Sequence, residues 1–264
     1  SFDQRSENMR VAIFSDAFPE RNGAGSYYHD LVEQLRYKVE ALELIQPASN
    51  SRGNRPQLAF PLPGDSTQKL VVPNVIGIRR QFRALNPHLV VAVTPGPFGL
   101  LGRALARGSG AGFITAFHTH FEDLASLYNS SFFFSVASWY MKKVNTFLFN
   151  SSDTVLVNNS GLQKTVKDLG AVRTDIIGTP VASVFLKPPV TAFRAGIERV
   201  LFAGRLAPEK NIPSVIQAAE VLPQIRFIIA GEGPLRKEVE ASGWRLVNMH
   251  VIGWLARDAL CEAL

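Results

Sequence analysis

Cysteine is almost absent from this chain of 264 residues, since Cys261 is the only one. A single cysteine excludes a disulfide framework and a thiolate metal cluster, and it is consistent with a reducing compartment. Long hydrophobic runs are missing too, because none reaches the roughly 18 residues needed to span a bilayer. The polar start, SFDQRSENMR, lacks the apolar segment of a signal peptide. We therefore expect a cytoplasmic protein.

Acidic residues are missing from one long stretch of the chain. Residues 66–121 contain no Asp or Glu, although six cations lie among them: Lys69, Arg79, Arg80, Arg83, Arg103 and Arg107. This asymmetry predicts an anionic surface or acceptor, with anionic phospholipid as the natural candidate. No nucleic-acid-binding module is recognisable, so we expect no nucleic-acid partner. A solvated basic face is the plain alternative, whereas lipid binding would make the protein peripheral on the inner face of a membrane.

Residues 132–149, FFFSVASWYMKKVNTFLF, are unusually aromatic. If this stretch is helical, its apolar residues share one side and Lys142 and Lys143 lie on another, as in an interfacial helix. The residues expected on the apolar side are Phe133, Val136, Tyr140, Val144 and Phe147. Most such stripes belong to a protein core, and this alternative stays open.

Apolar stretches of strand and helix length alternate along the chain, which predicts an α/β fold. With 46% hydrophobic residues, the chain can build one or two domains. Strands are expected at residues 10–15, 89–93, 112–116, 153–158, 176–179, 200–203 and 225–230, and helices at 26–35, 98–106, 161–169 and 212–222. Residues 49–67, rich in Ser, Pro, Gly and Asn, are expected to form a loop, and residues 185–194 a hinge.

A glycine turn with two nearby cations follows the strand expected at residues 200–203. That apolar run is typical of a strand buried on both faces, and Gly204 would let the backbone turn tightly after it. Arg205 and Lys210 lie five residues apart across the loop, so both cations can converge on one anion, such as a diphosphate. Taken alone, an ordinary turn with solvated charges is an equal alternative.

A second glycine turn follows the strand expected at residues 225–230. Gly231, Glu232, Gly233 and Pro234 would open another helix there, and its backbone amides and positive dipole end would face the same anion. Two such turns at the ends of successive parallel strands favour a phosphate-binding site over a pair of ordinary turns.

The start of the chain also reads as strand, glycine-rich loop and helix. The stretch FSDAFPERNGAG at residues 14–25 places Asn22, Gly23, Ala24 and Gly25 just before the expected helix. Backbone amides in such a loop can approach a phosphate or a sugar closely, because little side-chain bulk covers them. By itself this signal is weak, and a structural turn is the alternative.

A histidine follows the strand expected at residues 112–116, in the stretch FHTHFED at residues 117–123. His118 would lie at the carboxyl edge of a parallel sheet, where its ring can donate to a sugar hydroxyl. A structural histidine is the alternative, and for His120 we favour a structural or acceptor-side role. We expect no metal site, because the two histidines have no third ligand at a suitable spacing.

Three stretches of the carboxyl-terminal half together resemble the donor-binding half of the retaining glycosyltransferases of family 4: GRLAPEKN, IAGEGPLR and VIGWL, in that order. The resemblance implies a GT-B fold, with two facing Rossmann-like domains, and a nucleotide diphosphate sugar as donor, with no cofactor. It also implies that Arg205 and Lys210 bind the diphosphate, while Ile252 and Gly253 lie beside the nucleotide base. The implied donor site includes the turn glycines Gly204, Gly231 and Gly233.

The amino-terminal half resembles the same family. Gly23 and Ala24 match its glycine-rich donor-binding loop, although Ala24 stands where a second glycine is common. FHTHFED is similar to a stretch of members that glycosylate lipids, which implies that His118 lies at the reaction centre. A lipid or glycan acceptor would meet the acceptor-side residues Asp16, His120 and Glu122.

The resemblance implies sugar transfer with retention, in which the departing phosphate helps to deprotonate the acceptor and His118, Arg205 and Lys210 are catalytic. The expected domains are residues 1–187 and 188–264. The second is expected to be incomplete, because the paired-glutamate motif of the family has no match, and the narrow passage at residues 35–39 suggests that internal residues are absent too. A nucleotide-sugar epimerase of the same fold and a non-catalytic scaffold that binds a membrane or a partner are the alternatives.

Overall fold

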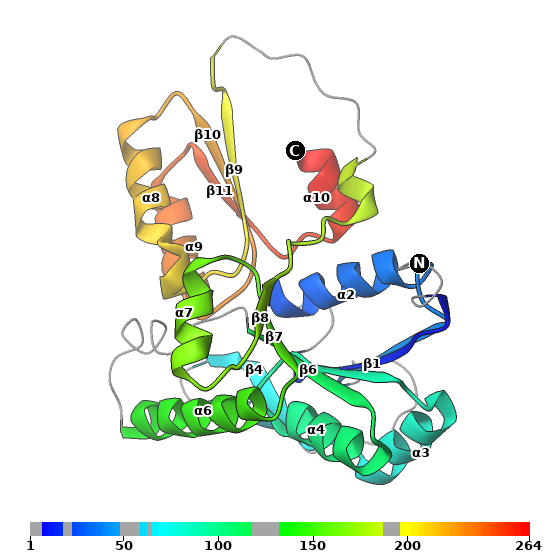
Figure 1. The fold of residues 1–264 in the computed structure, drawn as a ribbon. Coiled ribbons are helices and arrows are strands. Elements are labelled where there is room, and N and C mark those ends of the chain that lie inside the picture. The colour runs from blue at the N-terminus through cyan, green and yellow to red at the C-terminus, as the bar shows by residue number, and fades with distance from the viewer. Residues whose placement is uncertain (1–6, 18–22, 48–58, 63–64, 118–131, 187–195) are drawn as a thin grey trace. The chain divides into compact units, whose positions relative to one another are not determined.

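The computed structural model describes residues 7–17, 23–47, 59–62, 65–117, 132–186 and 196–264 (Figure 1). The chain forms two compact units, residues 1–61 with 69–180 and residues 62–68 with 181–264. The boundary expected between residues 187 and 188 lies outside the described residues, as does most of the expected hinge. None of the described helices is both long and apolar enough to cross a bilayer.

The first unit is built on a six-stranded parallel sheet in the order β2-β1-β5-β6-β7-β8. Apolar runs such as RVAIF suit strands that are covered on both faces, and Val11 lies between Leu42 and Leu89 of the neighbouring strands. The α/β fold is therefore confirmed. The strands are β1 (Arg10–Phe14), β2 (Ala41–Ile45), β5 (Leu89–Ala92), β6 (Gly112–Phe117), β7 (Thr154–Val157) and β8 (Thr174–Ile176).

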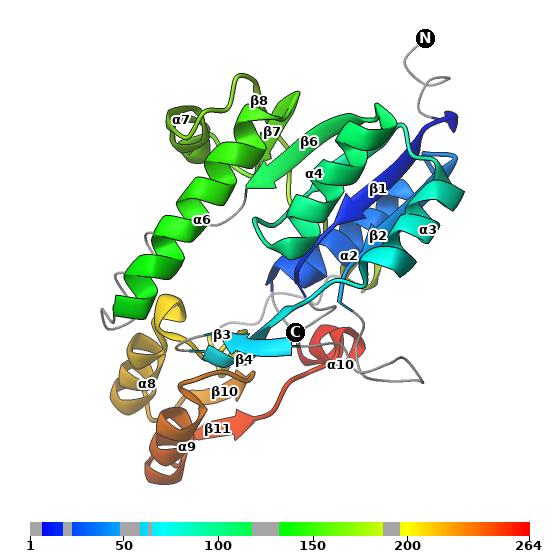
Figure 2. The same ribbon diagram turned by 90° about the horizontal axis from the view of Figure 1, so that it is seen from below.

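Helices cover both faces of this sheet (Figures 1 and 2). On one face lie α3 (Val75–Leu85), α4 (Pro97–Ser109) and α6 (Phe132–Asn150), and α7 (Gly161–Asp168) packs into the same core. The other face is covered by α2 (Gly23–Leu35). Phe14 points into the first core and Ile13 into the second, because successive residues of a strand face opposite sides.

Helix α2 begins three residues earlier than expected. Gly23 and Gly25 therefore belong to its first turn, and the loop expected there does not precede the helix. Packing of Tyr28 and Val32 against the sheet outweighs the low helix propensity of glycine. The passage from α2 to β2 is short. At its end the backbone N–H of Glu40 donates to the carbonyl of Met9 at 3.0 Å, which brings the start of β2 beside β1.

A small sheet occupies part of the stretch that was expected to be a loop. Strands β3 (Ala59–Leu62) and β4 (Asp65–Val71) pair with each other, and Val71 is buried in the first core. The loop prediction is therefore wrong for residues 59–62 and 65–67, since pairing between two short strands overrides a composition rich in Ser and Pro.

The helix expected at residues 132–149 is present as α6, in which Tyr140, Val144 and Phe147 follow one another at helical spacing. Val144 is buried in the first core beside Leu148, whereas Tyr140 and Phe147 are exposed. The described part of the expected apolar side is therefore divided between the core, which takes Val144, and the surface, where Tyr140 and Phe147 lie. The side chains of Phe133 and Val136 lie outside the described part.

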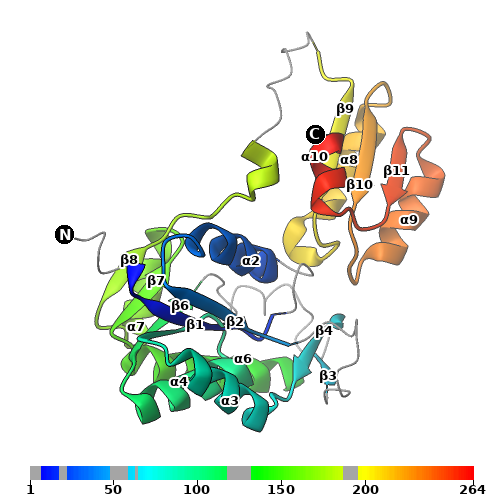
Figure 3. The same ribbon diagram turned by 90° about the vertical axis from the view of Figure 1, so that its right-hand side faces the viewer.

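The second unit contains a three-stranded parallel sheet in the order β11-β10-β9 (Figure 3). Its core gathers Ile212, Ala219, Phe227 and Val239 from both layers. The prediction that the first strand is buried on both faces is wrong, because this strand lies at an edge and Leu201 is only half-buried. The elements are η1 (Ser183–Leu186), β9 (Arg199–Ala203), η2 (Pro208–Lys210), α8 (Ile212–Val221), β10 (Arg226–Ala230), α9 (Arg236–Arg245), β11 (Met249–Ile252) and α10 (Arg257–Ala263).

Candidate active site

The two glycine turns of the second unit are joined by backbone hydrogen bonds. Gly204 donates to the carbonyl of Ala230 at 3.0 Å, and Leu206 donates to the carbonyl of Glu232 at 2.8 Å. In the opposite direction, Leu235 donates to the carbonyl of Leu206 at 3.0 Å. The turns therefore form one interlocked platform at the carboxyl ends of β9 and β10, the edge where open α/β sheets bind ligands.

Close packing between the turns requires glycine at two positions. Gly231 and Gly233 both have φ of 155°, which other residues rarely adopt. A Cβ atom on Gly231 would lie 1.8 Å from the carbonyl oxygen of Gly204, and one on Gly233 would lie 2.3 Å from that of Leu206. Gly204 is different, because a Cβ there would first meet the Phe202 ring at 3.7 Å. The steric need for glycine thus falls on the second turn rather than on Gly204.

Arg205 and Lys210 lie on the loop that leaves β9. Leu206 and Ala207 are fully buried and anchor this loop, while Lys210 ends the short helix η2 with an exposed side chain. The Arg205 guanidinium forms an ion pair with Glu209, and both side chains are largely buried. Glu209 was not singled out in the sequence, although its place four residues after Arg205 fits such a pair. It fixes the direction of one of the two candidate diphosphate ligands.

Arg236 is the functional candidate that sequence reasoning missed. Its Nη1 donates to the carbonyls of Gly231 and Ile252 at 2.9 and 3.3 Å and to Glu232 Oε1 at 3.0 Å. Its Nε donates to Glu240 Oε1 at 2.6 Å. One guanidinium therefore holds together the ends of β10 and β11. Part of the signal was available, since Glu240 lies four residues after Arg236 on the same helix face.

Ile252 and Gly253, expected beside the base, lie where β11 ends. The carbonyl of Ile252 also accepts from the backbone N–H of Gly231 at 3.4 Å. A Cβ on Gly253 would come within 3.5 Å of Glu232 Oε1, so this residue borders the same platform. Trp254 follows with its side chain half exposed, an aromatic surface at the carboxyl edge of the sheet.

In the first unit, Asp16 follows the end of β1 and binds the start of a distant helix. Its Oδ1 accepts from the backbone N–H of Phe98 at 2.9 Å, and its Oδ2 accepts from the Thr94 hydroxyl at 2.5 Å and from the N–H of Gly99 at 3.5 Å. The N-cap residue of α4 is Gly96, which has no side chain that could cap the helix. Asp16 supplies the anion that the free amides of α4 and their dipole attract.

Burial raises the pKa of the Asp16 carboxyl above its ordinary value. Hydrogen bonds from Thr94 and from the amides of Phe98, Gly99 and Gly96 lower it again without cancelling the effect of burial. The Asp16 carboxylate is thus held by contacts within the first unit.

The structure describes only some of the other residues that were expected to form a site in the first unit. His118, His120 and Glu122 lie outside the described residues, and β6 ends at the residue before His118. Gly23 and Ala24 form the first turn of α2, as described above. The ends of β1 and β5 meet through Asp16 and Thr94 at the carboxyl edge of the sheet.

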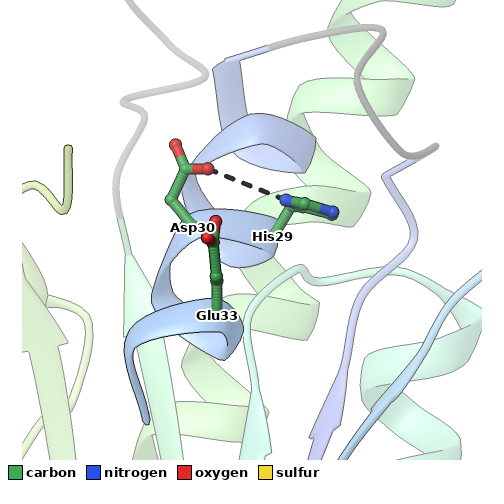
Figure 4. Close-up of side chains that lie close together, drawn as sticks. All are labelled: His29, Asp30 and Glu33. Carbon is green, nitrogen blue, oxygen red and sulfur yellow. Dashed lines mark ion pairs between the residues drawn. The ribbon is translucent and has the colours of Figure 1, made fainter. Parts of the chain in front are cut away.

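A cluster of possible metal ligands lies on α2, where none was expected. His29, Asp30 and Glu33 have ligand atoms within 4.8 Å of one another, and His29 Nδ1 lies 3.7 Å from Asp30 Oδ1 (Figure 4). Asp30 is buried, whereas the other two are exposed. Exposed acidic groups of this kind are common without an ion, so the cluster alone assigns no metal site.

Comparison with known families identifies the chain. The profile described as Glycosyltransferase Family 4 matches residues 21–182, and the profile described as Glycosyl transferases group 1 matches residues 187–263. The chain belongs to glycosyltransferase family 4. The two matches to glycosyltransferase families together cover most of both units of this glycosyltransferase. The platform of the second unit lies within the group 1 match. No curated protein sequence matches the chain.

Solved structures add the fold. Sucrose-phosphate synthase from Thermosynechococcus elongatus is 16% identical with a TM-score of 0.62, and the match covers 95% of this chain and 72% of that one. UDP-GlcNAc 2-epimerase from Neisseria meningitidis is 10% identical with a TM-score of 0.55, covering 96% and 74%. A trehalose-6-phosphate synthase is 11% identical with a TM-score of 0.54, covering 95% and 74%. These likenesses establish that the glycosyltransferase has the GT-B fold.

Proposed function

We propose that this glycosyltransferase moves a sugar from a nucleotide diphosphate sugar to an acceptor hydroxyl, with retention at the anomeric carbon. The observation that carries the donor half of the proposal is the interlocked platform of the two glycine turns, with Arg205 and Lys210 on its loop. Cations and backbone amides at the carboxyl edge of a parallel sheet suit a diphosphate.

The reaction mainly requires stabilisation of negative charge on the leaving group. Negative charge builds on the leaving diphosphate as the glycosidic bond breaks, and fixed cations in a partly desolvated site stabilise it. Arg205 is already oriented by Glu209, while the exposed Lys210 can reach a bound phosphate from its flexible stem. Trp254 offers an aromatic surface for the base beside Ile252.

Retention and the acceptor are further parts of the proposal. We nominate no carboxylate nucleophile, so the departing phosphate would take the acceptor proton while His118 orients the sugar. A trehalose-6-phosphate synthase of this fold has served to study enzymatic glycosyl transfer with retention, which supports this choice by analogy. Asp16, His120 and Glu122 would border a lipid or glycan acceptor, and no metal would be needed.

The alternatives are less favoured. An epimerase shares the fold, as the Neisseria meningitidis structure illustrates, but both family matches are to transferases. A scaffold without sugar chemistry would not need Gly231 and Gly233 packed against the loop that carries Arg205. Nucleotide binding separates the scaffold from the enzyme, and product analysis separates transfer from epimerisation.

Calorimetric titration with UDP and with GDP tests the donor site. We expect one nucleotide to bind and Lys210→Ala to weaken its binding by roughly tenfold or more, because a charge-assisted contact to phosphate is lost. The matched control is Lys167→Ala, which removes an exposed lysine from the last turn of α7 and should bind like the parent. Absence of binding by the parent to either nucleotide would contradict the proposal.

Arg205 allows a second matched comparison within the same unit. Arg205→Ala should weaken nucleotide binding, whereas Arg245→Ala, which breaks a more exposed ion pair with Glu220 at the far end of α9, should not. Equal losses in both variants would mean that Arg205 acts only through folding.

Two further measurements test the rest of the proposal. Sugar transfer should be unchanged in the presence of EDTA if no metal takes part, and the anomeric configuration of the product decides whether transfer occurs with retention.

A further inference from the structure

The outer helical layer of the first unit combines positive charge with exposed apolar side chains. Helices α3, α4 and α6 cover the same face of the sheet (Figures 1 and 2). Their sequences contain three arginines in α3, two in α4 and two lysines in α6, and no Asp or Glu in any of them. We call this layer the basic face.

Helix α3 places its apolar and basic residues along one exposed stripe. Ile78, Phe82 and Leu85 are buried in the core, so the opposite side of the helix faces solvent. That side carries Val75 and Ile76, of which Ile76 is 77% exposed. The exposed arginines of the stripe are Arg79, Arg80 and Arg83. The spacing of three and four residues keeps all of them on adjoining turns.

Helix α6 repeats the combination with aromatic residues. Its inner side buries Val144 and Leu148, while Trp139 is 62% exposed and Phe147 is 55% exposed. Lys142 and Lys143 lie between them and are exposed. Trp and Lys together are typical of helices at the interface between water and a bilayer, because one reaches the acyl boundary and the other the head groups.

The centre of the basic face is less charged than its sequence suggests. The Arg103 guanidinium lies 5.4 Å from the centre of the Phe113 ring, so this cation belongs to the packing between α4 and the sheet. Arg107 in the last turn of α4 is exposed. The described carboxylate that reaches α3 is Glu43 of β2, which accepts from Gln81 Nε2 at 2.5 Å. Because α3, α4 and α6 themselves carry no Asp or Glu, the basic face remains positive.

We propose that the basic face docks on an anionic phospholipid surface, with Ile76 and Trp139 entering the interface and the arginines of α3 contacting lipid phosphates. Charge complementarity selects the sign of the partner, and exposed Ile and Trp beside the cations select lipid over nucleic acid, whose grooves reward cations without such an apolar stripe. This inference deepens the proposed function, because a lipid acceptor would be met at this surface, although docking itself requires no sugar transfer.

Sedimentation of the full chain with vesicles tests the proposal. Vesicles of phosphatidylcholine alone are compared with vesicles that also contain phosphatidylglycerol. We expect binding to the anionic vesicles only, and a loss of roughly 100-fold in affinity for Arg79→Glu/Arg80→Glu/Arg83→Glu. Equal binding of parent and triple variant, or no binding to the anionic vesicles, would overturn the proposal.

A charge-matched variant controls for net charge. Arg36→Glu/Lys38→Glu/Arg173→Glu reverses three exposed cations outside the three helices and lowers the formal net charge of +6 by the same amount. It should retain nearly all of its affinity for anionic vesicles. An equal loss in this control would assign the attraction to overall charge and contradict a defined docking face.

The apolar part is tested separately. Ile76→Ser and Trp139→Ser change exposed side chains, so folding should be unaffected, and each should weaken vesicle binding by roughly tenfold. Unaltered binding in both, together with retention of a duplex DNA probe that the α3 triple variant loses, would assign the face to nucleic acid instead. Every variant is also titrated with UDP and GDP, and unchanged nucleotide binding shows that a failure of docking is independent of the donor site.

Discussion

The hydroxyl of Thr94 donates to Oδ2 of Asp16 at 2.5 Å and accepts from the backbone N–H of Asp16 at 2.8 Å. This reciprocal pair joins the second residue after β1 to the second residue after β5, two strands that are neighbours in the sheet. Because the same carboxylate caps α4, one side chain fixes two strand ends and a helix start at the edge where an acceptor would bind.

Asp16→Ala should lower the free energy of unfolding by about 1–3 kcal/mol, because it removes a helix cap and leaves the Thr94 hydroxyl without its acceptor. Urea unfolding followed by circular dichroism measures the change. Asp175→Ala, at an exposed position of β8, is the control and should stay within about 0.5 kcal/mol of the parent. An unchanged midpoint for Asp16→Ala would contradict the capping role.

The pH dependence of stability follows from the raised pKa of Asp16. The folded state binds the proton more tightly than the unfolded state, so the stability contributed by this group is present below its unfolded pKa and is lost as pH rises through its folded pKa. Relative to Asp16→Asn, the parent should therefore lose stability from about pH 4 upwards. Unfolding curves of both proteins at several pH values test the sign, which a parallel pair of profiles would refute.

Gly231→Ala should disrupt the donor platform, because its Cβ would lie 1.8 Å from the carbonyl oxygen of Gly204. Backbone has to move, and we expect a loss of at least about 2 kcal/mol in stability together with loss of nucleotide binding. Gly108→Ala is the control, since nothing lies within 4 Å of its Cβ and it occupies a helix. That change should leave stability equal or slightly higher, as Ala favours helix more than Gly.

Arg236→Ala should loosen the ends of β10 and β11, because the guanidinium donates to the carbonyls of Gly231 and Ile252. Amide hydrogen exchange in residues 229–236 should accelerate, and nucleotide affinity should fall several-fold. Arg236→Lys should rescue little, since an ammonium cannot reproduce the planar fork. If Arg245→Ala, which keeps these contacts, accelerated exchange in the same peptide equally, Arg236 would have no special role.

The sequence predicted the parallel sheets and the positions of the two glycine turns because apolar runs and glycines are local signals. It predicted the cation pair for the same reason, and the structure places Arg205 and Lys210 on one short loop. Which glycines are indispensable was not visible, since the restriction on Gly231 comes from the carbonyl of Gly204 on another strand.

Contacts between distant segments account for the rest. Asp16 meets α4 only after the chain has passed through two further strands of the large sheet, so no local pattern announces the cap. The pairing of β3 with β4 was hidden in a stretch whose composition favours loops. Whether the apolar side of α6 is core or surface could not be predicted, because the position of the sheet, rather than the helical period, decides that Val144 is buried and Phe147 is not.

The order β2-β1-β5 has a consequence for the chain while it is being synthesised. Until residues 89–92 leave the ribosome, β1 has β2 on one side and an open row of backbone amides and carbonyls on the other. Val11 and Ile13 would stand along that open edge, which is a template for pairing with another nascent chain. Pairing with β5 then satisfies the backbone groups of this edge. Thr94, which follows β5 in the chain, stabilises the pairing through its hydrogen bonds with Asp16. The length of the segment between β2 and β5 therefore sets how long this edge of β1 stays unpaired during synthesis.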